Sequence, residues 1–574
     1  MPSSPPDSQL PTPAVPAISP GERNWFIGLF IILLGLRLLY ARNMSFNSDE
    51  AQHLHVVWGW TVGLLQYRDI FDNHTPLFQI LCAPVFRLFG ETAMIMIYMR
   101  YAMILLFAAS LFSVIKIGER LFSLRAGLWA AVFTGFAPFF FLKTVEFRTD
   151  DLWTAAWLGT VAIAVGGSLT VRRMFFIGLA MGITFSVSMK TTLLALAIIL
   201  AALIAHVPAW RREKGWRAAT ILRGLGAWLC GLIAVPGIIL AYFASRHALD
   251  ELYYCVIQHN IVPAADSNPR LASRLFWFPA TLPFFIAAAT FIFRRTSDPV
   301  RAARRVVVLL TAGFFLTLLH SYWPKITSQD YPPVTPLLVV LVTPSVLGFG
   351  AFVRNHATWL PRIWLPIVLT FAEIAATLYI ERPNRRTTHY LEYLDHMLRF
   401  TDRGDYVMDA KAGAIFRRRP FYFALENVTR SRLLKHLIKD DIIECLVKTR
   451  TCAASDERLL GRDLAFVRAN YLPFSFKMRI AGQHLAPDPV TGRAAFDIRI
   501  AAPYTIVTPR GPAAGMLDGQ ANSGSIFLAP GQHEFTCADP LLPHVLVWSQ
   551  AFDRGFQPNF APASGERAIK KKRE

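Results

Sequence analysis

Charged residues are scarce in this sequence, and its cysteines follow no recognised pattern. Asp, Glu, Lys and Arg make up 17% of the 574 residues, whereas soluble domains usually carry about a quarter. The six cysteines are scattered without any CxxC spacing, which indicates neither a disulfide framework nor a zinc ribbon. A disulfide bond between Cys445 and Cys452 is compatible with the sequence if this region faces an oxidising compartment.

Several functional motifs are also missing. The sequence has no P-loop and no Rossmann fingerprint, so nothing indicates a nucleotide substrate. It lacks the internal repeats and paired broken helices of many secondary transporters. These absences weigh against a lipid or solute transporter, which remains an alternative.

Long apolar runs are what the sequence has instead. Hydrophobic residues make up 53% of the chain, and its mean hydropathy is +0.36. Apolar blocks long enough to cross a hydrocarbon core of about 30 Å recur up to residue 380 and then stop. We therefore predict a polytopic α-helical membrane protein with about eleven spans: 24–40, 92–117, 125–143, 152–170, 174–189, 191–208, 221–243, 274–293, 305–321, 333–353 and 362–380.

Four regions are expected along the chain. Residues 1–23, rich in Pro and Ser, form a disordered cytoplasmic tail, and residues 24–383 form the membrane domain with an external loop over 41–91. Residues 384–480 mix helical segments with short strands, one of them predicted over 442–448, and indicate an α/β region. Residues 481–574 alternate in short segments between turns, as in a β-sandwich, and end in a basic tail.

The distribution of positive charge predicts the topology. Lys and Arg cluster in alternate loops, such as "KIGERLFSLR" and "WRREKGWR", which the positive-inside rule places in the cytoplasm. The N-terminus is then cytoplasmic and the C-terminal region extracytoplasmic, that is, periplasmic for an inner (plasma) membrane. This topology accounts for much of the net charge of +20, so no nucleic-acid partner is needed.

The first external loop contains the acidic stretch "NMSFNSDEAQHLH" over 43–55. Ser48 can cap a helix that begins at Asp49, and acids in a first turn favour the helix dipole, which is a sufficient structural explanation. Apolar spacing downstream predicts an amphipathic helix on the membrane surface, with Asp49 and His53 together on its other face. A carboxylate beside a histidine has the makings of a general base.

More charged residues share the predicted external face. Asp150 and Asp151 head another span after Thr149, which is expected to cap it. The cations nearest the membrane edge are Arg100, Arg148, Lys190 and Lys325. Ionisable residues at that depth are costly and often functional, although a lysine can instead extend to the interface. Acids and cations together suit a reaction between a sugar hydroxyl and a lipid phosphate.

Three short motifs in the first loop are similar to a known family: Asp49-Glu50, Tyr67-Arg68-Asp69 and His74-Thr75-Pro76. They resemble the first external loop of the C-type glycosyltransferase (GT-C) superfamily, and most closely its protein O-mannosyltransferase-like and aminoarabinose-lipid A transferase-like members. The pair Asp150-Asp151 and the stretch "KITSQDYPPVTPLL", with Tyr331, extend the resemblance. It implies a polyprenyl (undecaprenyl) phosphate-linked sugar donor and a transfer that inverts the anomeric centre.

The resemblance implies roles for individual residues. Asp49 would deprotonate an acceptor hydroxyl, and Glu50 or Asp151 would orient that acceptor. The candidate catalytic residues are Asp49, Glu50, Asp150 and Asp151, and the candidate donor- or substrate-binding residues are Arg68, Asp69, His74, Arg100, Arg148, Lys190, Lys325 and Tyr331. No cofactor is required, but a divalent ion bound by His53, His74 and His259 stays open, although their spacing is not that of zinc proteases.

The expected partners follow from that reaction. They are the lipid-linked donor, membrane lipids, and an acceptor hydroxyl on lipid A, a surface glycan or a protein. A lipid-linked oligosaccharide polymerase or ligase is the nearest alternative function. Such an enzyme would use a diphosphate-linked donor and a large late external loop rich in Arg and His, whereas here the acids of the first loop dominate.

Overall fold

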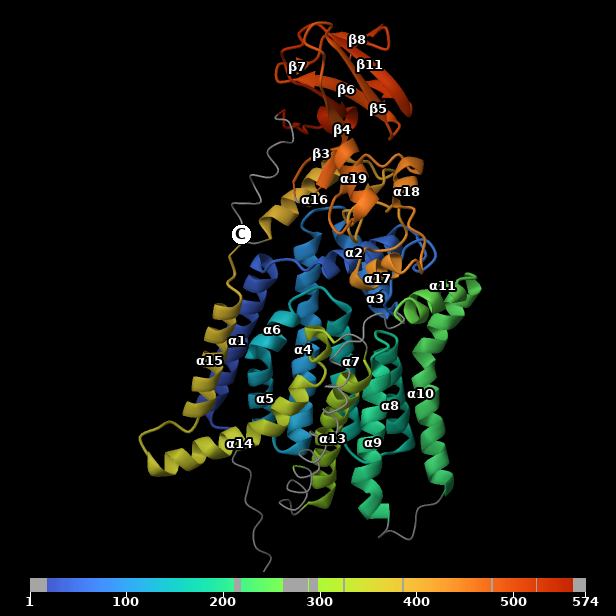
Figure 1. The fold of residues 1–574 in the computed structure, drawn as a ribbon. Coiled ribbons are helices and arrows are strands. Elements are labelled where there is room, and N and C mark those ends of the chain that lie inside the picture. Colours follow the sequence, from blue (N-terminus) through green and yellow to red (C-terminus); the bar gives the residue numbers. More distant parts are fainter. Residues whose placement is uncertain are drawn as a thin grey trace, which may run out of the picture.

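The structure is a computed structural model that describes residues 18–210, 218–261, 288, 298–323, 326–384, 387–475, 478–522 and 524–560. A helical bundle extends to residue 380. A smaller C-terminal part, which contains all the named β-strands, lies at one end of the bundle (Figure 1). Residues of this C-terminal part lie directly over the short helices that follow the first long helix (Figure 1).

The bundle consists of long helices and a few short ones. They are α1 (Pro20–Asn43), α2 (Ser48–Thr61), α3 (Leu77–Phe89), α4 (Ile95–Leu121), α5 (Leu124–Phe136), α6 (Pro138–Lys143), α7 (Thr149–Val165), α8 (Val171–Phe185), α9 (Thr191–Trp210), α10 (Ala218–Ser245), α11 (Leu249–Tyr253), η1 (Tyr254–Gln258), α13 (Pro299–Tyr322), η2 (Ser328–Asp330), α14 (Thr335–His356) and α15 (Trp364–Ile380). Each predicted span outside 274–293 coincides with helix. Segment 274–293 lies almost entirely outside the described residues.

Several of these helices are apolar enough to cross a membrane. Within the described ranges, α1, α4, α10, α13 and α14 meet that condition by length and composition, and α3, α5, α9 and α15 are shorter apolar helices. A chain with several such helices is a multi-pass membrane protein. The predicted total of about eleven spans stays a prediction.

Two predicted boundaries differ in the structure. Span 125–143 is divided into α5 and α6 at Pro138, because proline has no backbone N–H to continue the hydrogen bonding of a helix. The predicted tail 1–23 is shorter, since α1 begins at Pro20 and Ser19 caps it by accepting from the backbone N–H of Glu22 at 3.2 Å. Residues 1–17 lie outside the described residues.

Helix α2 differs most from its predicted environment. Its residues 50–59 are all buried, so it is not an amphipathic helix with one face in water. The polar face is covered by the C-terminal part; for example, Nδ1 of His55 lies 3.0 Å from the carbonyl oxygen of Ile415. The N-cap is Asn47, not Ser48, and it forms a capping box with Glu50.

The bundle also fixes the segment before α7. Arg37 of α1 is buried, and its guanidinium donates to the carbonyl of Phe141 at 2.8 Å and to Oγ1 of Thr144 at 3.0 Å. These bonds fix Phe141 and Thr144 against α1, at the start of the segment that leads to Arg148. Helix α7 then begins at Thr149 with Arg148 as its N-cap and no side-chain cap, so the predicted cap is shifted by one residue.

The C-terminal part mixes helices with two sheets. Its elements are α16 (Thr388–Phe400), β1 (Val407–Met408), α17 (Asn427–Leu434), α18 (Ile442–Lys448), β2 (Ala453–Ser455), α19 (Gly461–Asn470), β3 (Tyr471–Pro473), β4 (Met478–Leu485), β5 (Arg493–Ile498), β6 (Ala502–Thr508), β7 (Gly511–Pro512), β8 (Gly515–Leu517), β9 (Gln520–Ala521), β10 (Ile526–Leu528), β11 (Gly531–Cys537), β12 (His544–Trp548) and α20 (Ser549–Asp553). The strand predicted over 442–448 is wrong. This segment is α18, which buries Ile442 and Leu446 one helical turn apart.

One sheet crosses the boundary predicted at residue 480. It has the strand order β1-β2-β4-β12-β6-β10, with β3 paired to β4 and β7 to β6, while β5-β11-β8-β9 form the second sheet. Residues 478–481 of β4 pair with β2 and β3, and residues 482–485 of the same strand pair with β12. The two predicted C-terminal regions therefore share a sheet. All six cysteines are free, including Cys445 and Cys452.

Candidate active site

Asp49, in the first turn of α2, lies between two cations that come from distant parts of the chain. Its Oδ2 is 2.5 Å from Nη1 of Arg148, just before α7, and its Oδ1 pairs with Nζ of Lys411 from the C-terminal part. The Asp49 side chain is 34% exposed, whereas those of Arg148 and Lys411 are only 9% and 7% exposed. The carboxylate is thus the accessible member of a largely buried charge cluster.

The two cations determine the ionisation of Asp49. Burial favours the neutral acid, but the charges of Arg148 and Lys411 outweigh it and hold the pKa of the Asp49 carboxyl well below its usual range. Although burial opposes its charge, the carboxylates around Arg148 raise the pKa of its guanidinium. In the unliganded protein, Asp49 is therefore an ionised and strongly paired carboxylate.

Arg148 is held by further acids. Its Nε lies 3.0 Å from Oδ2 of Asp150, and its Nη1 lies 3.8 Å from Oε2 of Glu146. Glu146 also pairs with Lys143 at 3.1 Å. Asp151 is separate from this network: it is buried, and its Oδ2 has no hydrogen-bond partner. The predicted acidic pair therefore divides, with Asp150 on Arg148 and Asp151 inside the bundle.

Glu50 and Arg100 form a buried ion pair that shapes the loop. Both side chains are 0% exposed, and Nη2 of Arg100 lies 2.6 Å from Oε1 of Glu50. The Glu50 carboxylate also accepts from the backbone N–H groups of Asn47 and Phe147, each at 2.8 Å. In this conformation neither side chain is accessible to a donor or an acceptor. The pair joins the acidic loop to α4 and to the segment before α7, and the predicted roles of both residues at the substrate stay predictions.

Two histidines adjoin each other one helical turn beyond Asp49. His53 is buried one turn further along α2, its ring centroid lies 4.7 Å from that of His74, and neither of its ring nitrogens has a hydrogen-bond partner. Burial, and then His74 and Arg148, lower the pKa of His53. His74 Nδ1 lies 2.8 Å from Oδ1 of the buried Asp72. Burial opposes the imidazolium, but Asp72 outweighs it and raises the pKa of His74.

Asp72 was not a candidate from the sequence. Its Oδ2 accepts from the side-chain amides of Gln66 and Gln79 at 2.8 and 2.9 Å. It thereby fixes the position and the charge of His74. By contrast, Arg68 and Asp69 form an exposed pair with each other at 3.0 Å, and Asp69 accepts from the backbone N–H of Leu65.

A second charged pair lies beside the first turns of α7. Lys190, between α8 and α9, pairs with the fully buried Asp330 of η2, and its Nζ lies 5.9 Å from the ring centroid of Trp153 in the first turns of α7. Asp330 had no role predicted from the sequence. Tyr331 follows it, with its Oη 3.2 Å from Nε2 of His320. Lys325 lies outside the described residues.

The three candidate metal ligands do not come together. His53 and His74 adjoin each other, whereas His259 lies 3.5 Å from Glu426 and stacks on the ring of Phe423. Within the described ranges, no group of three or more His, Cys, Asp or Glu side chains could hold a metal ion. The donor set described here therefore gives no support to a metal centre.

Lys411 is another candidate site residue that the sequence did not indicate. It belongs to residues 409–419, here called the 409–419 loop. The carboxylate of Asp409, two residues before it, accepts hydrogen bonds from the backbone N–H groups of Lys411 at 3.0 Å and Gly413 at 2.8 Å. Left-handed backbone at Gly413 and at the two residues after it folds the loop back on itself. The side chain of Phe416 then packs on Phe86 of α3, with ring centroids 5.7 Å apart.

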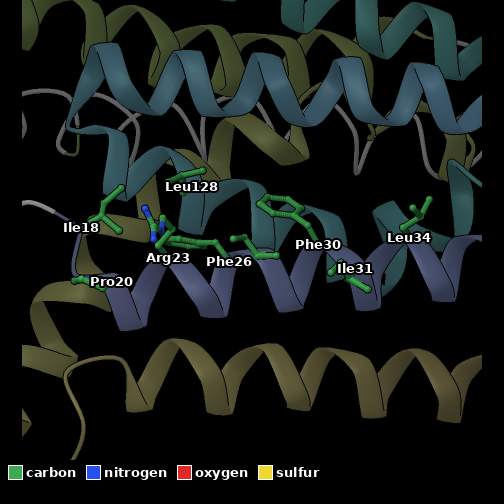
Figure 2. Close-up of a pocket in the computed structure, with 9 residues that line it drawn as sticks. Ile18, Pro20, Arg23, Phe26, Phe30, Ile31, Leu34 and Leu128 are labelled. Atoms are coloured by element: carbon green, nitrogen blue, oxygen red, sulfur yellow. The ribbon is translucent and has the colours of Figure 1, made fainter.

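A surface cavity elsewhere does not belong to this site. Figure 2 shows it along the first part of α1, where its lining is Ile18, Pro20, Arg23, Phe26, Ile27, Phe30, Ile31 and Leu34, with Leu128 of α5. Asp49 follows the opposite end of α1, and at 1.5 Å per residue that helix is about 36 Å long. The lining is almost entirely apolar, as expected of a helix surface that faces lipid.

Comparisons with known proteins agree with this architecture. The family model described as dolichyl-phosphate-mannose-protein mannosyltransferase matches residues 73–242. The crystal structure of ArnT from Cupriavidus metallidurans bound to undecaprenyl phosphate matches with a TM-score of 0.54 and 11% identity, over 80% of this chain and 98% of that one. Its apo state gives a TM-score of 0.52 and 12% identity over the same shares.

Other comparisons are weaker. The apo oligosaccharyltransferase from Archaeoglobus fulgidus matches over 88% of this chain and 75% of its own, with a TM-score of 0.46 and 10% identity, so the two folds are only distantly alike. A search of curated protein sequences finds no match. The resemblance is nevertheless confirmed: residues 73–242 match the protein mannosyltransferase family model, and the fold is similar to that of ArnT.

Proposed function

We propose that the protein transfers a sugar from a polyprenyl phosphate-linked donor to an acceptor hydroxyl outside the cytoplasm, with inversion at the anomeric carbon. The observation that carries the proposal is the position of Asp49, an accessible carboxylate beside two largely buried cations. The fold adds support, because an ArnT with the same fold has been crystallised with undecaprenyl phosphate.

The charges of the site suit this reaction. Asp49 takes the proton of the acceptor hydroxyl as the acceptor oxygen bonds to the anomeric carbon. The bond from that carbon to the phosphate oxygen breaks through an oxocarbenium-like transition state, and the electron pair leaves with the lipid phosphate. An ionised carboxylate and a phosphodiester, each with one negative charge, become a neutral acid and a phosphate dianion. Inversion requires that the hydroxyl attack from the side opposite the phosphate.

Arg148 is the cation best placed to receive that charge. It is nearly buried, so its interaction with a leaving phosphate is weakly screened by water. Asp150 and Glu146 hold it while the charge moves from Asp49 to the phosphate. His74, with its raised pKa, adds a second positive group near His53 and Asp49. Lys190 is a candidate for a more distant part of the donor.

The contacts of Asp49 also bear on topology. Because Lys411 pairs with Asp49, the acidic loop and the C-terminal part lie on one side of the membrane. With the positive-inside pattern, this supports an inner-membrane protein with a cytoplasmic N-terminus and a periplasmic C-terminal part. The acceptor is then a hydroxyl on lipid A, on a surface glycan or on a protein.

The test combines cells with purified protein. Mass spectrometry of lipid A, surface glycans and surface proteins from cells with and without the gene would identify the acceptor as the species that loses one sugar. Purified protein with a synthetic undecaprenyl phosphate-sugar should then transfer that sugar to the isolated acceptor, and the Asp49→Asn protein should not. If no envelope component changes and no undecaprenyl phosphate is released in vitro, the proposal is wrong.

A further inference from the structure

We propose that Lys411 is a ligand of the donor phosphate, supplied by the C-terminal part, and that the Asp49 carboxylate occupies the position of that phosphate until the donor binds. The inference rests on the proposed function and deepens it. It makes the C-terminal part a contributor to the active site and predicts that the donor binds before the acceptor reacts.

The position of Lys411 is unusual for a surface domain. Its side chain is 7% exposed and its ammonium faces the membrane domain, where it pairs with Asp49. A buried ammonium needs a negative partner, because its hydration is lost and not replaced. Asp49 is 34% exposed, so this partner lies on the accessible side of the cluster, where an incoming anion reaches both cations.

The loop around Lys411 holds it in place. Asp409 accepts four consecutive backbone N–H groups, from Lys411 through Ala414, and Arg419 donates to the carbonyl of Phe423 at 2.6 Å. Together with the packing of Phe416 on α3, these bonds present the ammonium to the bundle in one fixed position. Such preorganisation lowers the entropic cost of binding a ligand.

Asp49 cannot act as a base while both cations face it. A carboxylate paired with two cations has little affinity for a proton, yet the reaction requires that it accept one. A phosphodiester carries the charge that Lys411 and Arg148 need as a replacement partner, and its charge doubles as the lipid leaves. When the phosphate takes over the two cations, Asp49 is released and becomes more basic. The donor thereby prepares the base, and acceptor attack follows.

The two cations also suit a phosphate geometrically. Arg148 offers a planar fork and Lys411 a single point charge, a combination that fits two oxygens of one phosphate. Asp150, 3.0 Å from the Nε of Arg148, keeps the guanidinium oriented after Asp49 has left it. The site therefore keeps its shape when the carboxylate is exchanged for the donor.

The experiment compares three full-length variants with the unmodified protein. Lys411→Met removes the ammonium and keeps an apolar stem, and Lys411→Arg keeps the charge. Arg458→Met is the matched control, because Arg458 also reaches from the C-terminal part to the start of α2, where it contacts Ser48 at 3.3 Å and not Asp49. The probe is undecaprenyl phosphate, whose binding is measured by titration in nanodiscs, alongside steady-state transfer and thermal unfolding.

For Lys411→Met we expect lipid phosphate to bind about 10- to 100-fold more weakly, the range for loss of one charge-assisted hydrogen bond. The KM for acceptor should stay the same. The acidic limb of the pH–rate profile should move to higher pH, because Asp49 in the free protein loses one of the cations that depress its pKa. Lys411→Arg should recover most of the binding, and Arg458→Met should bind normally.

Failure of this inference can be distinguished from failure of the proposed function. Unchanged lipid affinity in folded Lys411→Met would overturn the inference, whatever the transfer activity. Tight, Lys411-dependent lipid binding without any sugar transfer would overturn the proposed function and leave the inference in place. If the unmodified protein binds no lipid phosphate, both are wrong.

Discussion

Replacing Asp49 by Asn gives the most informative test of the site, because the structure predicts its effects on stability and on rate separately. The change removes one charge and keeps the shape of the side chain. Because Asp49 is one-third exposed, water screens its two ion pairs, and each of them contributes up to about 1 kcal/mol to the free energy of unfolding. Loss of a first-turn acid adds about 0.3–1 kcal/mol. The free energy of unfolding should therefore fall by about 1–3 kcal/mol.

The expected effect on rate is larger and has a different cause. Without a carboxylate at residue 49, nothing at that position accepts the proton of the acceptor, and loss of a general base typically lowers the rate about 10²–10⁴-fold. That corresponds to about 2.7–5.4 kcal/mol in the activation barrier, at 1.36 kcal/mol per factor of ten. A protein that has lost only stability would keep its rate per folded molecule.

Asp150→Asn is the control, since the same substitution removes another carboxylate of Arg148 and leaves Asp49 in place. We expect this control to lose less than about tenfold in kcat, because it disturbs the orientation of Arg148 and no proton transfer. The assay is transfer from a synthetic undecaprenyl phosphate-sugar, with kcat normalised to the folded fraction from thermal unfolding. Near-normal turnover by folded Asp49→Asn would refute the base assignment, and Asp49 would then be a structural first-turn acid.

Three further predictions test the residues around Asp49 and α7. Glu50→Gln should lower the free energy of unfolding by about 3–5 kcal/mol, since it breaks a fully buried ion pair, and a normal Tm would contradict that structural role. Lys190→Met should destabilise the fold by a similar amount, because it leaves Asp330 buried without its cation. The double variant Lys190→Met with Asp330→Asn should recover stability. The donor affinity of that double variant then shows whether Lys190 also binds phosphate. The pKa of His74 is raised in the folded protein, so the imidazolium is fully present below the ordinary pKa of 6.5 and is lost as pH rises through the higher folded pKa. Lipid-phosphate affinity should fall as that charge is lost. In His74→Lys the fall should move toward the pKa of lysine, and an unchanged pH profile would exclude His74 from the phosphate site.

The helices of the bundle could be predicted because a membrane span is a local property. About twenty apolar residues suffice to define one, and no distant partner is involved. Short segments lack that redundancy. Residues 442–448 were predicted as a strand, but their apolar residues also fit one face of a helix, and the structure forms α18. The burial of α2 depends on Ile415 and its neighbours, more than 300 residues away in the chain, and no local pattern contains that information.

The site was also predictable only in part. Asp49, Arg148 and Asp150 were candidates, and the structure brings these three together. Glu50 and Arg100 were also candidates, because a buried ionisable residue has the same sequence signal whether it binds a substrate or another side chain. Lys411 gave no signal, since a lysine in a soluble region is ordinary. Only the fold of the 409–419 loop makes its position exceptional.

Phe416 provides the last prediction, because it tests whether the C-terminal part acts through the position of Lys411. Its side chain is fully buried and packs on Phe86 of α3, so Phe416→Ala should cost about 3–5 kcal/mol in unfolding free energy. It should also weaken lipid-phosphate binding, since the loop loses its contact with the bundle. If this loss arises because Lys411 moves, adding Phe416→Ala to Lys411→Met should weaken binding no further, and a double-mutant cycle would show a coupling energy comparable to the smaller single effect. Additive effects on lipid affinity, measured on the folded fraction, would mean that Phe416 supports the fold alone and that the position of Lys411 is set by other contacts.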